Sequence, residues 1–536
     1  MAEVASSIRT GGGQQGIQEK IHNVLDWRFS DLPPEQREVL ELVSVFSSGA
    51  SFDDLAAIMG VDRLVLSERV GLLTSRGTLI EEEDEAGNIR LLFRHACLRD
   101  FFYNGIGQVR RRELHRRLAE YLEGFYDPDI WDSTLSTALC HHLHCAAMPV
   151  KELDFMLREM RTQVMLNHEL FPPLDDEQLK RTQGILGGKA ETMSRLDRLK
   201  TLLFNLDRKR VEMREYLNLE ATILELQGGY MIGWGQYPEG LQAVRRGLEL
   251  ARVNEFTRIH LNCLKHLCYY GIQTEDAGFL DVQGQEMLFV ARECGDILCQ
   301  GIAKRFIGVA LQLQGDFDRA ETVLQESSDL FVQMGYGGHP HTLGVLAAQS
   351  YIGEIRHWRG DLEGALRTFR ECIDACVSSG LSWGLGLFCS KAGNAAFDMG
   401  DRELAGKYVH KSIRLFEKGQ GGRSGSIAHS LRAILDAEAG AYARALSAMQ
   451  ASENLCVPIQ KRSWMAVHYT ACYCVKKELE HGLPRGFSQS ESDAEAYEAL
   501  SAFLPEPSQA YAQKAAALAK ELHIAPKLLF FSDFLK

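Results

Sequence analysis

The sequence predicts a mostly α-helical protein in which a winged helix precedes an α-solenoid of tetratricopeptide-like helical hairpins. Turn glycines recur about every 40 residues in the second half of the chain, between amphipathic helical patterns. Near the N-terminus, three short helical patterns precede two β-like runs. With 536 residues, the chain also exceeds what one hydrophobic core usually supports, so several units or a stacked array are expected.

Composition and charge narrow the class of protein. Hydrophobic residues make up 45% and charged residues 24%, as is usual for folded proteins. The net charge of -13 repels phosphate, which argues against nucleic acid and anionic membranes as partners. No apolar run approaches the roughly 20 residues of a membrane span, and the first residues lack a signal-peptide core. We therefore expect a cytoplasmic protein without membrane contact.

The changes in pattern along the chain predict five regions. They are a flexible N-terminus (1–16), a winged helix with a preceding helix (17–106), a helical connector (107–192), tetratricopeptide-like repeats (193–480), and a polar loop with a C-terminal capping helix (481–536). Thirteen cysteines are spread through apolar helical patterns, so free thiols are expected in place of a disulfide framework.

The predicted winged helix consists of three helices and a hairpin. Pro33 and Pro34 begin the first helix, and Gly60 and Gly77 end the second and third. Ala86-Gly-Asn88 has the composition of a hairpin turn. The expected ranges are 17–25 for the preceding helix, 35–46, 51–59 and 64–76 for the three helices, and 78–80 and 89–93 for the strands.

Many winged helices bind DNA through the third helix, which here carries Arg63, Arg69 and Arg76. Asp62 and Glu68 offset these charges, and the wing carries five consecutive acids at 81–85 where a DNA backbone would approach. Acidic groups at that position oppose binding to phosphates. Nucleic acid is therefore not the expected partner, although a ligand-responsive regulator that binds DNA through these arginines stays as the alternative.

Four segments carry a resemblance to a known family. They are Gly16–Ile21, Leu32–Leu40, Phe93–Tyr103 and Arg111–His115, and they resemble the region that follows the nucleotide-binding domain in bacterial STAND-type signal-transduction ATPases. That family includes large ATP-binding transcriptional regulators and adenylate-cyclase-linked regulators. The resemblance implies that the winged helix is an inhibitory or relay element and that the helical repeats are a sensor arm.

The ATPase of that family is missing from this sequence. A P-loop needs four residues between its glycines, then Lys and a hydroxyl residue for magnesium. The nearest approach, Gly184–Ala190, has three intervening residues and no hydroxyl. We therefore expect a relay and sensor arm without nucleotide cofactor or ATP hydrolysis, which works with an ATPase or cyclase on a separate chain.

The repeats are defined by a turn glycine and a small residue five positions later. Glycine ends the first helix in the left-handed conformation, aspartate caps the second, and the small residue allows a close helix crossing. A degenerate turn is expected near Thr274. The segments are Gly235–Gly240, Gly315–Ala320, Gly360–Ala365, Gly400–Ala405 and Gly440–Ala445, of which the second closely matches the tetratricopeptide signature.

The concave face of such a solenoid is lined by the first helix of each hairpin and is the usual binding surface. Polar residues on the predicted first helices are therefore candidates for binding a protein or peptide partner. They are Lys304, Arg305, Glu354, Arg356, Lys391 and Asn394. A second hypothesis is a small ligand that changes the curvature of the solenoid.

Metal binding and catalysis are not predicted. In Cys140-His-His-Leu-His-Cys145, the pairs Cys140/His144 and His141/Cys145 each share a helix face, but the two faces differ. Four ligands therefore cannot converge from this helix alone. The sequence shows no nucleophile elbow, zinc-protease helix or phosphate loop, so we expect a protein that is not an enzyme.

The C-terminal region predicts a polar loop at 482–493, a break at Pro505 and Pro507, and a helix near 510–522. The apolar terminus Leu528–Phe531 is expected to cap the last repeat by packing on it.

Overall fold

The computed structural model describes residues 23–46, 49–83, 87–126, 133–168, 171–181, 189–209, 211–335, 338–418, 425–481 and 491–525. Contacts divide the chain into two compact units, with the main boundary between Phe155 and Met156. This boundary lies in α9 (Pro149–His168), inside the predicted connector. Among the described residues, no helix is both long and apolar enough to cross a membrane.

The first unit contains the three expected helices and the hairpin, in the expected order. A short strand that the sequence did not predict, β1, completes an antiparallel sheet of order β1-β3-β2. The elements are α3 (Pro34–Val45), β1 (Ala50–Ser51), α4 (Phe52–Met59), α5 (Arg63–Ser75), β2 (Leu79–Glu83), β3 (Ile89–Phe93), α6 (Ala96–Gly105), α7 (Gln108–Glu123) and α8 (Ser133–Cys145).

Local chemistry sets the ends of these helices. Ser51 Oγ accepts hydrogen bonds from the first-turn amides of α4, and Gly60 ends that helix with φ at 64°. Asp62 caps α5, and Gly77 follows its end with φ at 67°. The acidic run is a correction to the sequence analysis, because Glu81–Glu83 extend β2 and pair with Ile89–Leu91 instead of forming the tip of the hairpin.

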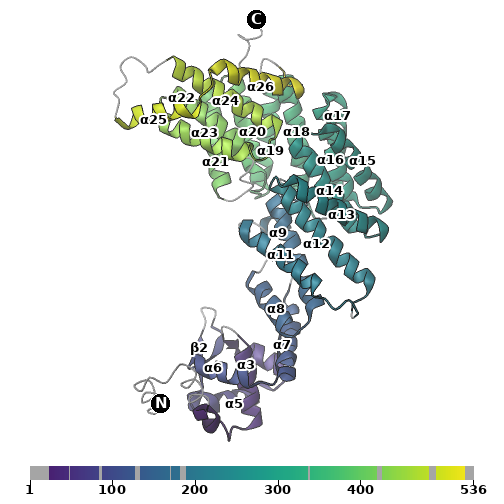
Figure 1. Ribbon diagram of the computed structural model, residues 1–536, viewed down its shortest axis with the longest axis vertical. Coiled ribbons are helices and arrows are strands. Elements are labelled where there is room, and N and C mark those ends of the chain that lie inside the picture. The colour runs from purple at the N-terminus through teal and green to yellow at the C-terminus, as the bar shows by residue number, and fades with distance from the viewer. Residues whose placement is uncertain are drawn as a thin grey trace. The chain divides into compact units, whose positions relative to one another are not determined.

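The second unit is a solenoid of helical hairpins, which Figure 1 shows stacked one beside the next. Two helices, α10 (Asp176–Arg181) and α11 (Lys189–Phe204), precede it. The hairpins are α12 (Met213–Gly233) with α13 (Tyr237–Val253), α14 (Thr257–Thr274) with α15 (Ala277–Glu293), α16 (Ile297–Leu313) with α17 (Phe317–Gly335), α18 (Thr342–Arg359) with α19 (Leu362–Ser378), α20 (Leu385–Asp398) with α21 (Arg402–Glu417), and α22 (Ser426–Glu438) with α23 (Tyr442–Cys456).

The turn chemistry of the hairpins confirms the predicted repeat. The five turn glycines, Gly235, Gly315, Gly360, Gly400 and Gly440, all have φ between 72° and 85°. At the degenerate turn, Glu275 adopts φ of 54° without a glycine. Asp361 and Asp401 each cap the second helix of their hairpin through a side-chain oxygen.

The C-terminal part differs in one element from the prediction. The expected polar loop does not extend to residue 493, because α25 (Glu491–Phe503) already begins at residue 491. α26 (Ser508–Glu521) is the predicted terminal helix and packs on α24 (Arg462–Glu480). The glycine-free, alanine-containing sequence of α25 favours a helix, although its polar start resembles a loop. Residues 1–22 and the apolar terminus Leu528–Phe531 lie outside the described residues, so the predictions for them stay untested.

The first hairpin is held by close contacts at glycine. A Cβ atom on Gly228 would lie 2.5 Å from Val244 Cγ2, and one on Gly229 would lie 2.4 Å from the ring of His266. That ring is fixed by a hydrogen bond of 2.9 Å between Nε2 and the buried Glu225 carboxylate. Side chains at these two positions therefore cannot enter without moving α13 or α14.

Gly229→Ala is expected to destabilise the second unit by about 2 kcal/mol, because the added methyl group overpacks the α12–α14 contact. Gly278→Ala is the matched control: it lies on exposed α15 surface, where the nearest atom to a new Cβ is 3.8 Å away. That control should be neutral or slightly stabilising. Denaturant midpoints measure both effects, and equal midpoints for the two variants would contradict the close-crossing account.

Candidate functional site

The first helices of the hairpins are buried around most of their circumference. In α16, Phe306 and Val309 are buried on one face of the helix, and Ile307 and Leu311 are buried on other faces. A helix that is apolar on all sides must have packing partners on all sides. We call the surface of the first helices that is turned away from the second helices the inner face. Much of this inner face is covered by the chain itself.

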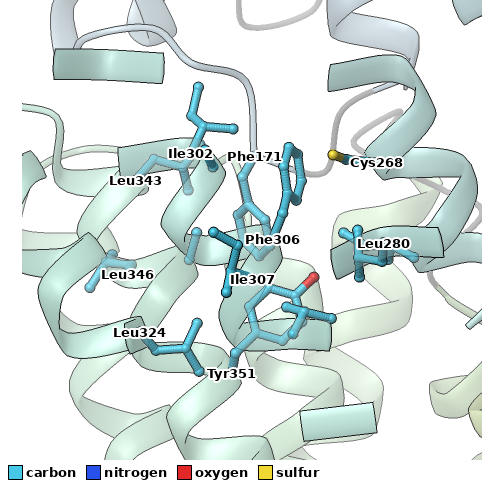
Figure 2. Packing of buried hydrophobic residues seen from close by; sticks show 14 of the residues in the cluster. Phe171, Cys268, Leu280, Ile302, Phe306, Ile307, Leu324, Leu343, Leu346 and Tyr351 are labelled. Atoms are coloured by element: carbon cyan, nitrogen blue, oxygen red, sulfur yellow. The ribbon is translucent and has the colours of Figure 1, made fainter. Parts of the chain in front are cut away.

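A segment from the connector, residues 171–181, covers one part of the inner face. The ring of Phe171 stacks on Phe388 with centroids 6.0 Å apart, and it meets Tyr351 edge-on at 6.4 Å. The Arg305 guanidinium lies 5.6 Å from the centre of the same ring. Figure 2 shows Phe171 among the side chains of α16, with Tyr351 nearby. Phe171 thus joins three successive first helices, α16, α18 and α20.

Asp176 fastens this segment to the start of α18. Its carboxylate accepts hydrogen bonds from the Thr342 amide at 2.9 Å and from the Thr342 hydroxyl at 2.6 Å. The Asp176 amide donates to the Pro340 carbonyl at 2.9 Å. An aspartate at this position satisfies an amide that the helix itself cannot pair. The connector therefore provides the N-terminal cap that α18 lacks in its own sequence.

The six predicted partner-binding residues fall into two groups. Lys304 forms an ion pair with Glu326 of α17, Arg305 lies buried against Phe171, and Arg356 donates to Thr368 Oγ1 at 2.7 Å. These three side chains are engaged inside the solenoid. Glu354, Lys391 and Asn394, in contrast, converge on one recess of the inner face.

This recess is the candidate functional site. It lies between α24 and the first helices α18, α20 and α22, with a contribution from Phe369 of α19 and from Ile524 after α26, and it holds a cavity of about 60 Å³. Polar groups stand beside apolar walls. The apolar lining includes Trp358, Phe369, Phe397, Ile427, Leu431, Ile434, Ala466 and Val467, and the polar lining includes His357, Asp398, Ser463 and Thr470.

Two ion pairs set the charge of the recess. Lys391 Nζ lies 3.0 Å from Glu354 Oε2 and 4.9 Å from the centre of the Tyr351 ring. Burial raises the pKa of Glu354, but the charges of Lys391 and Lys461 outweigh burial and bring the pKa below its usual value.

The second pair is His357 with Asp398, whose Nε2 and Oδ2 atoms are 2.6 Å apart. Burial raises the pKa of Asp398 despite the hydrogen bond from His357. Both side chains of this pair are almost fully buried, so the pair forms the floor of the recess rather than its rim.

Contacts that are distant in sequence hold the edge of the recess. The Glu275 carboxylate, at the degenerate turn, accepts from the Ser463 amide at 2.9 Å. The Tyr237 hydroxyl donates to the Ile459 carbonyl at 3.2 Å, and the Ala525 amide donates to the Trp358 carbonyl at 2.9 Å. The turns after α12 and α14 therefore hold the start of α24, and the end of α18 holds the residues after α26.

A cavity of this size limits what can bind. A liquid water molecule occupies about 30 Å³, whereas pockets for drug-sized ligands occupy roughly 300–1,000 Å³. The recess can accept one side chain or a few waters. A buried charge pair beside apolar walls suits a side chain that combines an apolar body with a polar end.

The three predicted DNA-binding arginines lie on or after α5. Arg63 forms an ion pair with Asp53 and lies over the Phe52 ring, and Arg76 donates to Gln36 Oε1 at 3.3 Å. Arg69 is half-buried on the helix. Two of the three cations are thus engaged within the first unit.

Sequence reasoning missed His357, Asp398 and the Phe171 segment. The signal for the covered inner face was present in α16, whose apolar residues extend beyond one stripe. No local pattern, however, identifies Phe171 as the residue that packs there, because more than 120 residues separate it from the start of α16. The His357–Asp398 pair joins neighbouring hairpins and has no motif of its own.

Comparison with known proteins finds distant similarity to solved structures. No family model and no curated protein matches it. A STAND protein with a tetratricopeptide-repeat sensor from Pyrococcus horikoshii has 11% identity and a TM-score of 0.46, over 84% of this chain and 68% of that one. A Rap protein complexed with Competence and Sporulation Factor has 13% identity and a TM-score of 0.48, over 77% and 96%. The apo quorum sensor NprR from B. thuringiensis has 12% identity and a TM-score of 0.40, over 74% and 96%. The chain is a mostly α-helical solenoid of the tetratricopeptide type.

Lys391→Met is expected to lower the free energy of unfolding of the second unit by about 2 kcal/mol, because it removes the ion-pair partner of the Glu354 carboxylate. The side chains of Lys391 and Glu354 are 11% and 22% exposed, so the loss of stability should be smaller than for a fully buried ion pair. Lys407→Met is the control, since the Lys407–Glu403 pair is exposed on α21. Urea denaturation measures the stability of both variants. A Lys391→Met midpoint equal to that of Lys407→Met would contradict a stabilising role of the Lys391–Glu354 ion pair.

Proposed function

We propose that this chain is a non-enzymatic regulatory protein of the cytoplasm whose helical repeats bind a peptide or an extended protein segment. The recess of Glu354, Lys391 and Asn394 is the observation that supports this proposal most directly. It lies on first helices, it has apolar walls beside charged groups, and it has room for one side chain of a partner. The four helices around it can supply further contacts to a bound chain.

The size of the recess argues against a cofactor or a catalytic pocket. Among its described lining residues, Ser463 and Thr470 are the hydroxyl groups, and His357 is already paired with Asp398. A nucleophile with a base in reach and room for a substrate is the minimum for acyl transfer. A recess for one side chain serves recognition.

For the first unit we infer a winged helix that acts as a relay. The three helices, the sheet order β1-β3-β2 and the hairpin support this assignment. The four segments that resemble STAND-type regulators also belong to this region, while the sequence has no P-loop. The proposed target of the relay is an ATPase or a cyclase on a separate chain.

The binding proposal is tested with peptides selected from a random displayed library against the whole chain. Asn394→Trp places an indole in the recess. It is expected to lower the affinity for the selected peptides by about tenfold or more, and a tenfold loss corresponds to about 1.4 kcal/mol of binding free energy. Lys407→Trp, on exposed α21, is the control and should leave affinity within about twofold. Fluorescence anisotropy gives both affinities. Failure to select any peptide, or equal weakening by both variants, would refute the proposal.

The relay is tested separately by affinity capture from the native cytosol. Recovery of an ATPase or cyclase with the whole chain is the expected result. Capture that never includes such an enzyme would contradict the relay, while the peptide affinities would still decide the binding proposal.

The alternative function, DNA binding through Arg63, Arg69 and Arg76, has a clear test. Because two of these arginines are engaged and Glu81–Glu83 lie on the neighbouring strand, the triple alanine variant should bind duplex DNA at low salt as weakly as the wild type. Electrophoretic mobility shifts measure this. Tight binding that weakens steeply with salt and is lost in the triple variant would instead establish the DNA-binding regulator.

A further inference from the structure

A second group of chemically reactive side chains lies in the first unit, far from the recess in sequence. His115 on α7 meets His141 and Cys145 on α8, and their nitrogen and sulfur ligand atoms all lie within 4.8 Å of one another. Cys145 Sγ and His141 Nε2 are 3.8 Å apart. Two helices that pack against each other thus bring together three donors of the kind that bind zinc.

We propose that His115, His141 and Cys145 form a zinc-binding site that joins α7 to α8. In a tetrahedral site with Zn–N distances of about 2.0–2.1 Å and a Zn–S distance of about 2.3 Å, neighbouring ligand atoms are roughly 3.3–3.6 Å apart. The observed atoms, which lie within 4.8 Å of one another, need to approach by up to about 1.5 Å. Rotation of the His141 and Cys145 side chains can supply this movement.

The sequence showed one half of this site. His141 and Cys145 are four residues apart on one helix face, the spacing by which helices present two ligands to one ion. The other pair in the motif goes elsewhere, because His144 Nδ1 contacts Glu152 at 3.1 Å. The third donor comes from α7, as zinc sites usually draw ligands from separate elements. Only the packing of α7 on α8 reveals it.

The surroundings of His115 resemble the outer shell of a metal site. Its Nδ1 lies 2.9 Å from Nδ1 of the buried His142, and its Nε2 lies 3.1 Å from the Tyr103 hydroxyl. Metal-ligating histidines commonly use the second ring nitrogen for a hydrogen bond that fixes the orientation of the ring. With the Nδ1 hydrogen donated to His142, Nε2 of His115 carries a lone pair, and a metal ion bound there takes the place of the hydrogen bond from the Tyr103 hydroxyl.

The ligand set selects the metal and its coordination. Thiolate and imidazole donors favour zinc over magnesium or calcium, which prefer oxygen. His115 is buried, Cys145 is partly exposed and His141 is exposed, so the ion can enter from the His141 side. A water molecule would complete the four ligands there.

The test uses the whole chain after removal of metal by a chelator. Zinc binding is followed by competition with a chromophoric chelator, and Co²⁺ is used as a spectroscopic probe of the ligands. One Zn²⁺ per chain and a thiolate-to-cobalt charge-transfer band are expected. Cys145→Ser should abolish the band and weaken zinc binding by about 100-fold. His141→Gln, at an exposed position that tolerates substitution, should also weaken zinc binding. It should leave the circular dichroism spectrum of the protein unchanged.

The chain carries twelve other cysteines, so matched controls are needed. Cys140→Ser changes the neighbouring cysteine of α8, and Cys97→Ser changes an exposed cysteine of the first unit. Both should retain the band and the zinc affinity. Absence of stoichiometric zinc in the wild type, or loss of the band in either control to the same extent as in Cys145→Ser, would overturn the proposal.

Discussion

A helix that is buried around most of its circumference must find packing partners on every side, and the first helices of this solenoid are of that kind. The second helices cover two sides of α16, and the neighbouring first helices cover others. The inner side needs a further partner. Phe171 supplies it across α16, α18 and α20, and Asp176 holds that segment at the start of α18. The burial of the first helices thus ties the connector to the solenoid.

The same constraint explains why a recess remains where it does. Phe171 covers part of α16, α18 and α20, whereas the residues after α26 contact the end of α18 and the start of α24 contacts the turn after α14. Between these two covers, Glu354 and Lys391 introduce charge into an otherwise apolar inner face. A buried charged pair needs hydrogen-bond partners that apolar neighbours cannot supply. The recess that results is small, polar on one side and apolar on the other.

Local chemistry made the helices, the turns and the fold class predictable from the sequence. Glycine in the left-handed conformation and aspartate caps act over a few residues, so Gly360 and Asp361 mark a turn without any knowledge of the rest. The candidate site was only partly predictable. Glu354, Lys391 and Asn394 were identified by their position on first helices, but Arg305 could not be recognised as the partner of Phe171.

The contacts that could not be predicted share one property: they join residues far apart in the chain. Glu275 and Ser463 are separated by 188 residues, and His115 meets α8 through packing that no helical spacing encodes. How two helices that are distant in the chain align against each other depends on many side-chain contacts between them. A periodic pattern within one helix does not specify those contacts. Such residues are found once the helices have been placed in space.

The central claim is that a partner inserts a side chain into the recess between α18, α20, α22 and α24. The most direct measurement is site-specific photo-crosslinking of a bound peptide, with a small aliphatic diazirine amino acid, which does not fill the recess as an indole does, at Asn394 in one variant and at Lys407 in another. The account predicts a crosslink from position 394, mapped by mass spectrometry to one peptide residue, and none from position 407. Equal crosslinking from both positions, or crosslinking from position 407 alone, would contradict it.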